Sequence, residues 1–160
     1  MNCFQNLVSL IRQTTFEAYS AINKSEAAFN VHEEGSYLSK EIIRAAIDKK
    51  ANFLEDKVFS NYNKLEKEID KLVGKGYKVK VFMSYLPVDE AKRRIKARYE
   101  RTGRDVPEEY VEHCYSEINP TFEKLKKKGL SNKGLIQIAQ FDMNVERGEA
   151  PKLKFIDKAE

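Results

Sequence analysis

The chain has 160 residues, of which 41% are hydrophobic and 34% charged, and its formal net charge is +4. This length predicts one domain with a buried core, and no apolar run is long enough to span a membrane. Acidic and basic residues alternate, which argues against a nucleic-acid surface. The two cysteines and two histidines are too scattered to suggest a disulfide framework or a metal site. These features predict a soluble, cytoplasmic protein.

Two helices are predicted before residue 50. The first, over about residues 6–24, is only weakly patterned. The second begins at Ser36, whose side chain is a candidate helix cap, and ends at residues 48–50. Its apolar residues share one face of the helix: Leu38, Ile42, Ile43, Ala46 and Ile47.

A strand is predicted over residues 52–59, NFLEDKVF, with Glu55 and Asp56 toward its far end. Ligands of α/β sheets usually bind beside the carboxyl ends of the strands, so this acidic pair is a candidate ligand site. The alternative is an ordinary exposed acid that faces a loop. An amphipathic helix over residues 61–73 follows, and Gly74 and Gly76 end it.

The stretch from residue 76 to residue 107 is the most informative part of the chain. Its short run of β-branched and aromatic residues predicts a buried strand over residues 77–86. A basic helix follows and leads into an arginine-bearing turn closed by Pro107. Guanidinium groups presented in this way can bind phosphate oxygens in bidentate fashion, although most arginine-rich helices are solvated surfaces. The basic residues of the helix are Arg93, Arg94, Lys96, Arg98 and Arg101.

The last third of the chain predicts one long helix and two strands. The helix starts at Pro107, has a candidate kink or division at Asn119-Pro120, and ends at Gly129. A strand over residues 135–141 has Asp142 and Asn144 at its edge, and a short strand over residues 153–156 follows a turn-rich connection. The alternation of strands and helices predicts parallel βαβ units.

Common catalytic motifs are not found in the sequence. It contains no G-x-x-x-x-G-K-[ST] phosphate loop, no G-x-G-x-x-G, no G-x-S-x-G elbow and no H-E-x-x-H. The motifs therefore identify neither a nucleophile nor a phosphate-binding loop.

From about residue 16 onward, the chain resembles the zeta toxin family of kinases in several segments that occur in the family order. VHEEGSYLSKEIIRAAI resembles the helix after the substrate loop, and NFLEDKVFSN resembles a strand that ends in an acid. KGYKVKVFMSYLPVDEAKRRIKARYERTGRDVPEEYV resembles the following strand, helix and arginine-bearing lid. FDMNVERGEAPKLKFI resembles the closing strand and its Asp-Asn turn. The combination is a more specific signal than any one segment.

The resemblance implies an α/β fold, a three-layer P-loop-kinase-like parallel sheet, and a toxin–antitoxin context. Family members use ATP and Mg²⁺ to phosphorylate a UDP-linked amino sugar. Arg98, in RYE, and Arg104, in GRDVP, match two family arginines that face the transferring phosphate. Such arginines neutralise charge that develops on the phosphoryl oxygens. Asp56 matches the family acid that helps to hold the sugar, but the Gly-Thr that follows it in the family is Lys57-Val58 here.

The family begins with a strand, a Walker-type loop and an aspartate that acts as general base. The first fifteen residues, MNCFQNLVSLIRQTT, contain no glycine, lysine or aspartate. The resemblance thus implies one domain over residues 1–160, with a divergent segment at 1–15, that lacks the first strand and the Walker A loop.

Three hypotheses follow from this departure. The chain is a degenerate relative without kinase activity, its P-loop half comes from a separate polypeptide, or it is a binding module for a nucleotide sugar or an antitoxin-like protein. Binding to RNA through the arginines is an alternative from another class, and a steep loss of affinity with salt would reveal it.

Overall fold

The computed structural model describes residues 17–18, 21, 27–103, 106–130, 134–146 and 148–159. The chain forms two compact units, one made of Met1–Asp56 and Arg101–Asp105, and the other of Lys57–Glu100 and Val106–Glu160. The predicted helix over residues 6–24 lies mostly outside the described residues, although residues 17, 18 and 21 are helical. No helix in the described ranges is long and apolar enough to cross a membrane.

The first unit contains one long helix, α2 (Ala27–Asp48). Its end agrees with the sequence prediction, but its start does not, because Ser36 lies inside the helix instead of capping it. The buried residues Val31 and Ala46 lie on the face that carries Leu38 and Ile42, so the apolar stripe already begins before Ser36.

The strand predicted over residues 52–59 is wrong, because this segment has no regular secondary structure. Leu54 and Val58 are 63% and 52% exposed, and the intervening charged residues are exposed as well. The run therefore lacks a continuous apolar face that a sheet could bury. Phe59, at its end, packs against the core of the second unit.

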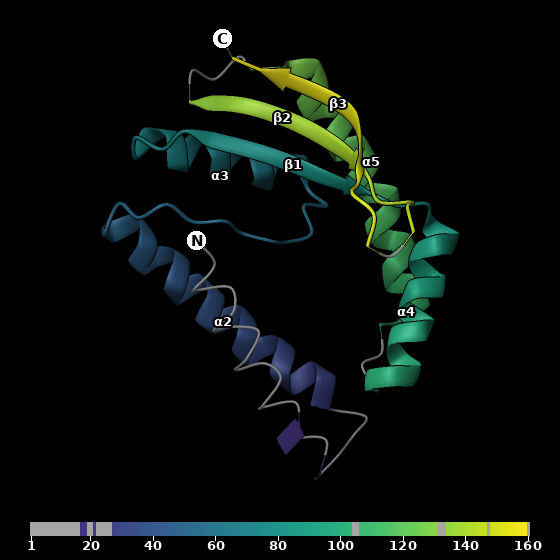
Figure 1. Cartoon of the computed structure of the whole chain (residues 1–160). Coiled ribbons are helices and arrows are strands. Elements are labelled where there is room, and N and C mark those ends of the chain that lie inside the picture. The colour runs from purple at the N-terminus through teal and green to yellow at the C-terminus, as the bar shows by residue number, and fades with distance from the viewer. Residues whose placement is uncertain are drawn as a thin grey trace. The chain divides into compact units, whose positions relative to one another are not determined.

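The second unit contains a three-stranded sheet of β1 (Val79–Tyr85), β2 (Leu135–Asp142) and β3 (Lys152–Lys158) in the order β1-β2-β3 (Figure 1). β1 and β2 are parallel, as predicted, and β3 is antiparallel to β2, so the sheet is mixed. These elements confirm an α/β fold compatible with a P-loop-kinase-like architecture. The parallel pair needs a crossover, which the two helices between β1 and β2 provide.

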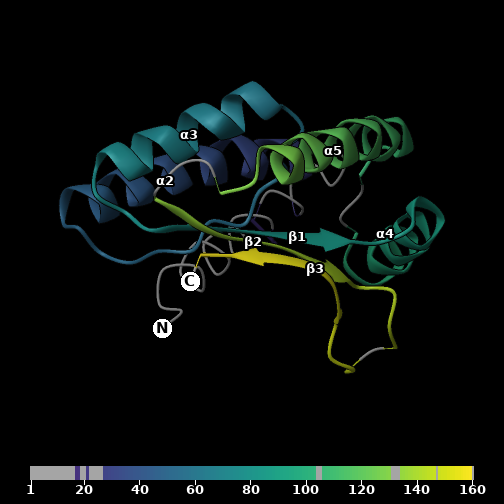
Figure 2. The same cartoon turned by 90° about the horizontal axis from the view of Figure 1, so that it is seen from above.

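Three helices accompany this sheet: α3 (Tyr62–Gly74), α4 (Val88–Thr102) and α5 (Glu108–Lys128). Figure 2 shows α3 and α5 on the same face of the sheet and α4 beyond the carboxyl end of β1. Pro120 does not divide α5, which continues as one helix through it. Asn61 caps α3 by accepting a hydrogen bond from the backbone N–H of Lys64 at 3.0 Å.

The core of the second unit forms where α3 and α5 meet β1 and β2. Phe122 and Ile138 are fully buried. The register shift between Val79 and Lys80 leaves an extra residue in β2, so that Leu135 and Ile138 both reach the core face although they are three positions apart. The buried core residues are Leu65, Ile69, Val81, Met83, Phe122, Leu125, Leu135 and Ile138.

Gly134 allows the start of β2 to approach α3 closely. A Cβ atom at this position would lie 2.4 Å from both Cγ atoms of Val73. The carbonyl oxygen of Gly134 also accepts a hydrogen bond from the N–H of Val79 at 2.7 Å, which starts the β1–β2 pairing. Gly134 therefore takes part both in the packing of β2 against α3 and in the pairing of β2 with β1.

We predict that Gly134→Ala lowers the midpoint of thermal unfolding, because the added methyl group must displace Val73 or the strand. Overpacking of this kind typically costs about 1–3 kcal/mol of unfolding free energy. Gly74→Ala is the matched control, since a Cβ atom there meets nothing within 4 Å. Thermal unfolding followed by circular dichroism should also show that adding Val73→Ala to Gly134→Ala restores part of the lost melting temperature. Equal stability of the two glycine variants would contradict this packing.

Candidate functional site

The carboxyl ends of β1 and β2 meet at one edge of the sheet, because the two strands are parallel. Tyr85 ends β1 and lies beside Asp142, which ends β2. The N–H of Met143 donates to the carbonyl oxygen of Tyr85 at 2.8 Å and so extends the pairing past the end of β2. Ligands of α/β sheets usually bind beside this edge, so we treat it as the candidate site.

Asp142 and Asn144 form the turn that follows β2. The backbone N–H of Asn144 donates to Oδ1 of Asp142 at 2.9 Å, and Nζ of Lys154 lies 3.4 Å from Oδ2. The hydrogen bond from Asn144, together with the charge of Lys154, lowers the pKa of Asp142 below its ordinary value. The Asp142 side chain is therefore a carboxylate that holds its own turn and a neighbouring cation.

Tyr85 joins this turn to α5 and β3. Nζ of Lys154 lies 4.1 Å from the centroid of the Tyr85 ring, a cation–π distance. On the other side, the hydroxyl of Tyr115 donates to the hydroxyl of Tyr85 at 3.4 Å. This hydrogen bond and partial burial raise the pKa of Tyr115 above its ordinary value. The carboxyl edge of the sheet thus carries two phenols, a carboxylate and an ammonium group.

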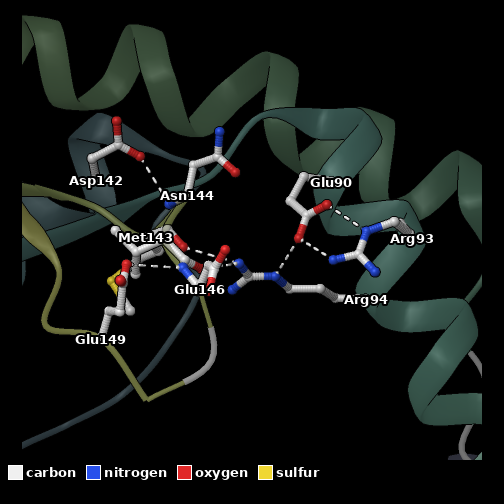
Figure 3. A network of polar contacts seen from close by, with 9 residues as sticks. Glu90, Arg93, Arg94, Asp142, Met143, Asn144, Glu146 and Glu149 are labelled. Atoms are coloured by element: carbon white, nitrogen blue, oxygen red, sulfur yellow. Dashed lines mark hydrogen bonds and ion pairs between the residues drawn. The ribbon is translucent and has the colours of Figure 1, made fainter.

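The first turn of α4 contains a carboxylate that binds two arginines (Figure 3). Nε of Arg93 donates to Oε2 of Glu90 at 2.6 Å, and Nη2 of Arg93 donates to Oε1 at 2.7 Å. Nε of Arg94 donates to the same Oε1 at 2.7 Å. The hydrogen bonds from Arg93 and then Arg94 lower the pKa of Glu90 from 4.5 to about 2. Glu90 therefore remains charged well below neutral pH and orients both guanidinium groups.

Arg94 also binds the connection that follows β2. Its Nη2 donates to the carbonyl oxygen of Met143 at 3.1 Å and to that of Val145 at 3.2 Å. Figure 3 shows the guanidinium group between Glu90 on the helix and this connection. A charged donor shared by two carbonyl oxygens makes a stronger link than a neutral hydrogen bond. The basic helix is in this way joined to the sheet edge.

Lys92, on α4, joins this helix to the start of α5. Its Nζ lies 2.5 Å from a carboxylate oxygen of Glu108 and 2.5 Å from one of Glu112. These two carboxylates, with Glu108 contributing most, raise the pKa of Lys92 above its ordinary value. Two acids in the first turns of α5 and one lysine thus hold the two helices together.

Of the three site residues predicted from the sequence, Arg98 is the one that the structure places in the second unit. It follows Arg94 by one helical turn on α4, it is half-buried, and its Nε atom is buried. Arg104 lies outside the described residues. Asp56 is exposed and belongs to the first unit, and the strand that it was predicted to end does not form.

Sequence reasoning missed the roles of Arg94 and Lys154. The spacing of Glu90 and Arg94, four positions apart on a helix, could have predicted their ion pair. The contact of Arg94 with Met143 joins residues 49 positions apart, and no local pattern predicts such a contact. The same holds for Lys154 and Tyr85, which come from different strands.

Apart from the sheet edge, a hollow with a volume of about 170 Å³ lies at the start of α3. Lys57 and Lys64 line it, and Lys57 forms an ion pair with Glu68. The side chains that line this hollow include both cationic and anionic groups, because Glu68 lines it as well. Within the described ranges, no group of three His, Cys, Asp or Glu side chains could hold a metal ion.

We predict that Glu90→Gln lowers the melting temperature most near neutral pH, with a smaller effect in acid. The folded-state pKa of Glu90 is depressed to about 2, so its stabilising contribution is complete above the ordinary pKa of 4.5 and is lost as the pH falls toward 2. The difference in melting temperature between the native chain and the variant should narrow over that interval. Glu117→Gln, at an exposed position of α5, is the control. A difference that does not change between pH 5 and pH 2 would argue against the ion pairs.

Residues 10–149 match the zeta toxin family. No curated protein and no solved structure was found to match. The family match covers well over half of the sequence and includes the segment that carries the strand β1, the basic helix α4 and the turn after β2. The chain therefore belongs to the zeta toxin family.

Proposed function

We propose that this chain takes part in ATP-dependent phosphoryl transfer to a UDP-linked amino sugar, as a zeta-toxin-like kinase. The observation that supports this best is the position of α4. The helix carries Arg98 and is joined through Arg94 to the connection at the carboxyl end of β2. An arginine held beside the ligand edge of a P-loop-type sheet is suited to bind phosphate.

In this proposal, Arg98 and Arg104 neutralise charge on the transferring phosphoryl group. The planar guanidinium fork can bind two phosphoryl oxygens, and it stays charged at any physiological pH. Its contribution grows as negative charge spreads over the equatorial oxygens in the transition state. Asp56 is the proposed ligand of the sugar, as the matching acid is in the family.

ATP and Mg²⁺ are implied by the family and would supply the phosphoryl donor. The 160 residues contain no G-x-x-x-x-G-K-[ST] pattern. The described part of the chain also offers no three-membered group of metal ligands. We propose that the phosphate-facing arginines and the sugar site belong to this chain, and that a separate polypeptide with a P-loop holds ATP. No step of the reaction is assigned to the metal.

The second candidate function is a binding module that grips a nucleotide sugar or an antitoxin-like protein without catalysis. The missing phosphate-loop pattern favours it, because the arginines of α4 can bind phosphate whether or not a phosphoryl group is transferred. Both functions suit the cytoplasm, where nucleotide sugars are available. The kinase and the nucleotide-sugar module differ in turnover, whereas a module for an antitoxin-like protein differs from both in its ligand.

We predict that UDP-N-acetylglucosamine binds the chain and that Arg98→Ala weakens the binding or abolishes turnover. Isothermal titration measures the affinity for the sugar nucleotide and for ATP with Mg²⁺. Transfer of radiolabelled phosphate measures turnover, which should fall by about 10³-fold in Arg98→Ala if this arginine faces the transition state. Arg93→Ala, which alters a 70%-exposed arginine on the same helix, is the control.

The outcomes separate the candidate functions. Phosphorylation of the sugar supports the kinase. Binding of the sugar nucleotide without turnover, lost in Arg98→Ala but kept in Arg93→Ala, supports the binding module. Failure to bind either nucleotide contradicts the kinase and the nucleotide-sugar module, and favours an inactive relic or a protein–protein role. RNA binding that weakens steeply with salt would replace them with the nucleic-acid alternative.

A further inference from the structure

Met143, the first residue after β2, is fixed from two sides. Its N–H donates to the carbonyl oxygen of Tyr85, at the end of β1, over 2.8 Å. Its own carbonyl oxygen accepts a hydrogen bond from Nη2 of Arg94 over 3.1 Å. The same nitrogen also binds the carbonyl oxygen of Val145. The path of the connection after β2 is thus determined jointly by the sheet and by α4.

The guanidinium group of Arg94 is itself oriented by Glu90. Nε of Arg94 donates to Oε1 of Glu90 over 2.7 Å, so the helix holds one side of the fork while Nη2 reaches the two carbonyl oxygens. Because guanidinium is planar, fixing Nε against the carboxylate also fixes the direction of Nη2. Figure 3 shows this arrangement, with Arg94 extended from the helix toward the connection.

Arg94 and Arg98 lie on the same face of α4, since they are four positions apart in one helix. The helical turn of α4 that carries Arg94 is therefore directly followed by the helical turn that carries Arg98. A rotation of α4 about its axis that broke the contacts of Arg94 would also move Arg98. The contacts of Arg94 are therefore one of the restraints on the position of Arg98 relative to the carboxyl edge of β2, beside the ion pairs that join Lys92 to α5.

We propose that Arg94 is a positioning residue: by binding the carbonyl oxygens of Met143 and Val145, it sets where Arg98 meets the phosphate groups of the substrate. This inference rests on the proposed function for the identity of the ligand, but the link itself is a property of the free chain.

Two variants distinguish the contact of Arg94 with the carbonyl oxygens of Met143 and Val145 from a general effect of positive charge on α4. Arg94→Lys keeps the positive charge but replaces the planar fork with a single ammonium group, which cannot bind Glu90 and both carbonyl oxygens in the same geometry. Arg93→Ala removes the neighbouring arginine, whose hydrogen bonds go to Glu90 within the part of the chain that the structure describes. Both chains should fold, because α4 contributes no buried residue to the core.

The first measurement uses the ligand-free full chain and nuclear magnetic resonance. In Arg94→Ala and Arg94→Lys, we expect the backbone amide signals of residues 143–146 to shift and their hydrogen exchange to accelerate by about tenfold or more, with far-ultraviolet circular dichroism unchanged. Arg93→Ala should leave these amides close to their native positions. Unchanged amide signals and exchange in Arg94→Ala would overturn the proposed link, whatever the chain binds.

The second measurement adds UDP-N-acetylglucosamine and follows the Nε–H signal of Arg98. In the native chain and in Arg93→Ala, the ligand should shift this signal. In Arg94→Lys, we expect no such shift, and the affinity for the ligand should fall by at least about tenfold. The affinity should fall because the ammonium group introduced by Arg94→Lys cannot hold α4 as the planar guanidinium fork does, so Arg98 is displaced from the ligand.

A double-mutant cycle then tests whether Arg94 acts through Arg98. Adding Arg94→Ala to Arg98→Ala should cause little further loss of affinity, since the group to be positioned is already absent. Fully additive losses would overturn the positioning role. If the native chain does not bind the nucleotide sugar, the proposed function fails, and the amide measurement on the free chain still decides whether the link exists.

Discussion

The parallel pairing of β1 with β2 is the constraint on which the rest of this structure depends. It brings the carboxyl ends of two strands that are far apart in sequence to the same edge of the sheet. The crossover between them must span the sheet, and α4 and α5 form that crossover. The segments that leave β1 and β2 consequently start side by side, with Tyr85 and Asp142 as neighbours.

The charged groups around this edge form a connected set whose members depend on one another. Glu90 orients Arg94, which binds the connection after β2, and Asp142 within that region binds Asn144 and Lys154. Each of these contacts is partly exposed and contributes modestly to stability by itself. Their effect is geometric, because Arg94 joins α4 to the connection after β2 and Asp142 holds the turn at the start of that connection.

The helices and strands that were predicted correctly are those with a strong local pattern. The periodic apolar residues of α3 and α5 and the glycines that follow them are sufficient to place these helices. The strand over residues 52–59 was predicted wrongly because its residues resemble those of a strand, whereas the exposed Leu54 and Val58 have no covering layer. Ser36 was misread as a cap because the apolar stripe of α2 extends beyond it toward Val31.

The sequence by itself determined the α/β class and the family, since helical period, strand composition and linear motifs are properties of neighbouring residues, whereas the phosphate-facing role of Arg98 stays a prediction. Only the tertiary structure decided that β3 runs antiparallel, that Gly134 must lie against Val73, and that Arg94 binds the connection after β2. These features join residues that are distant in the chain. Their positions follow from the packing of whole elements on one another, and no local pattern encodes that packing.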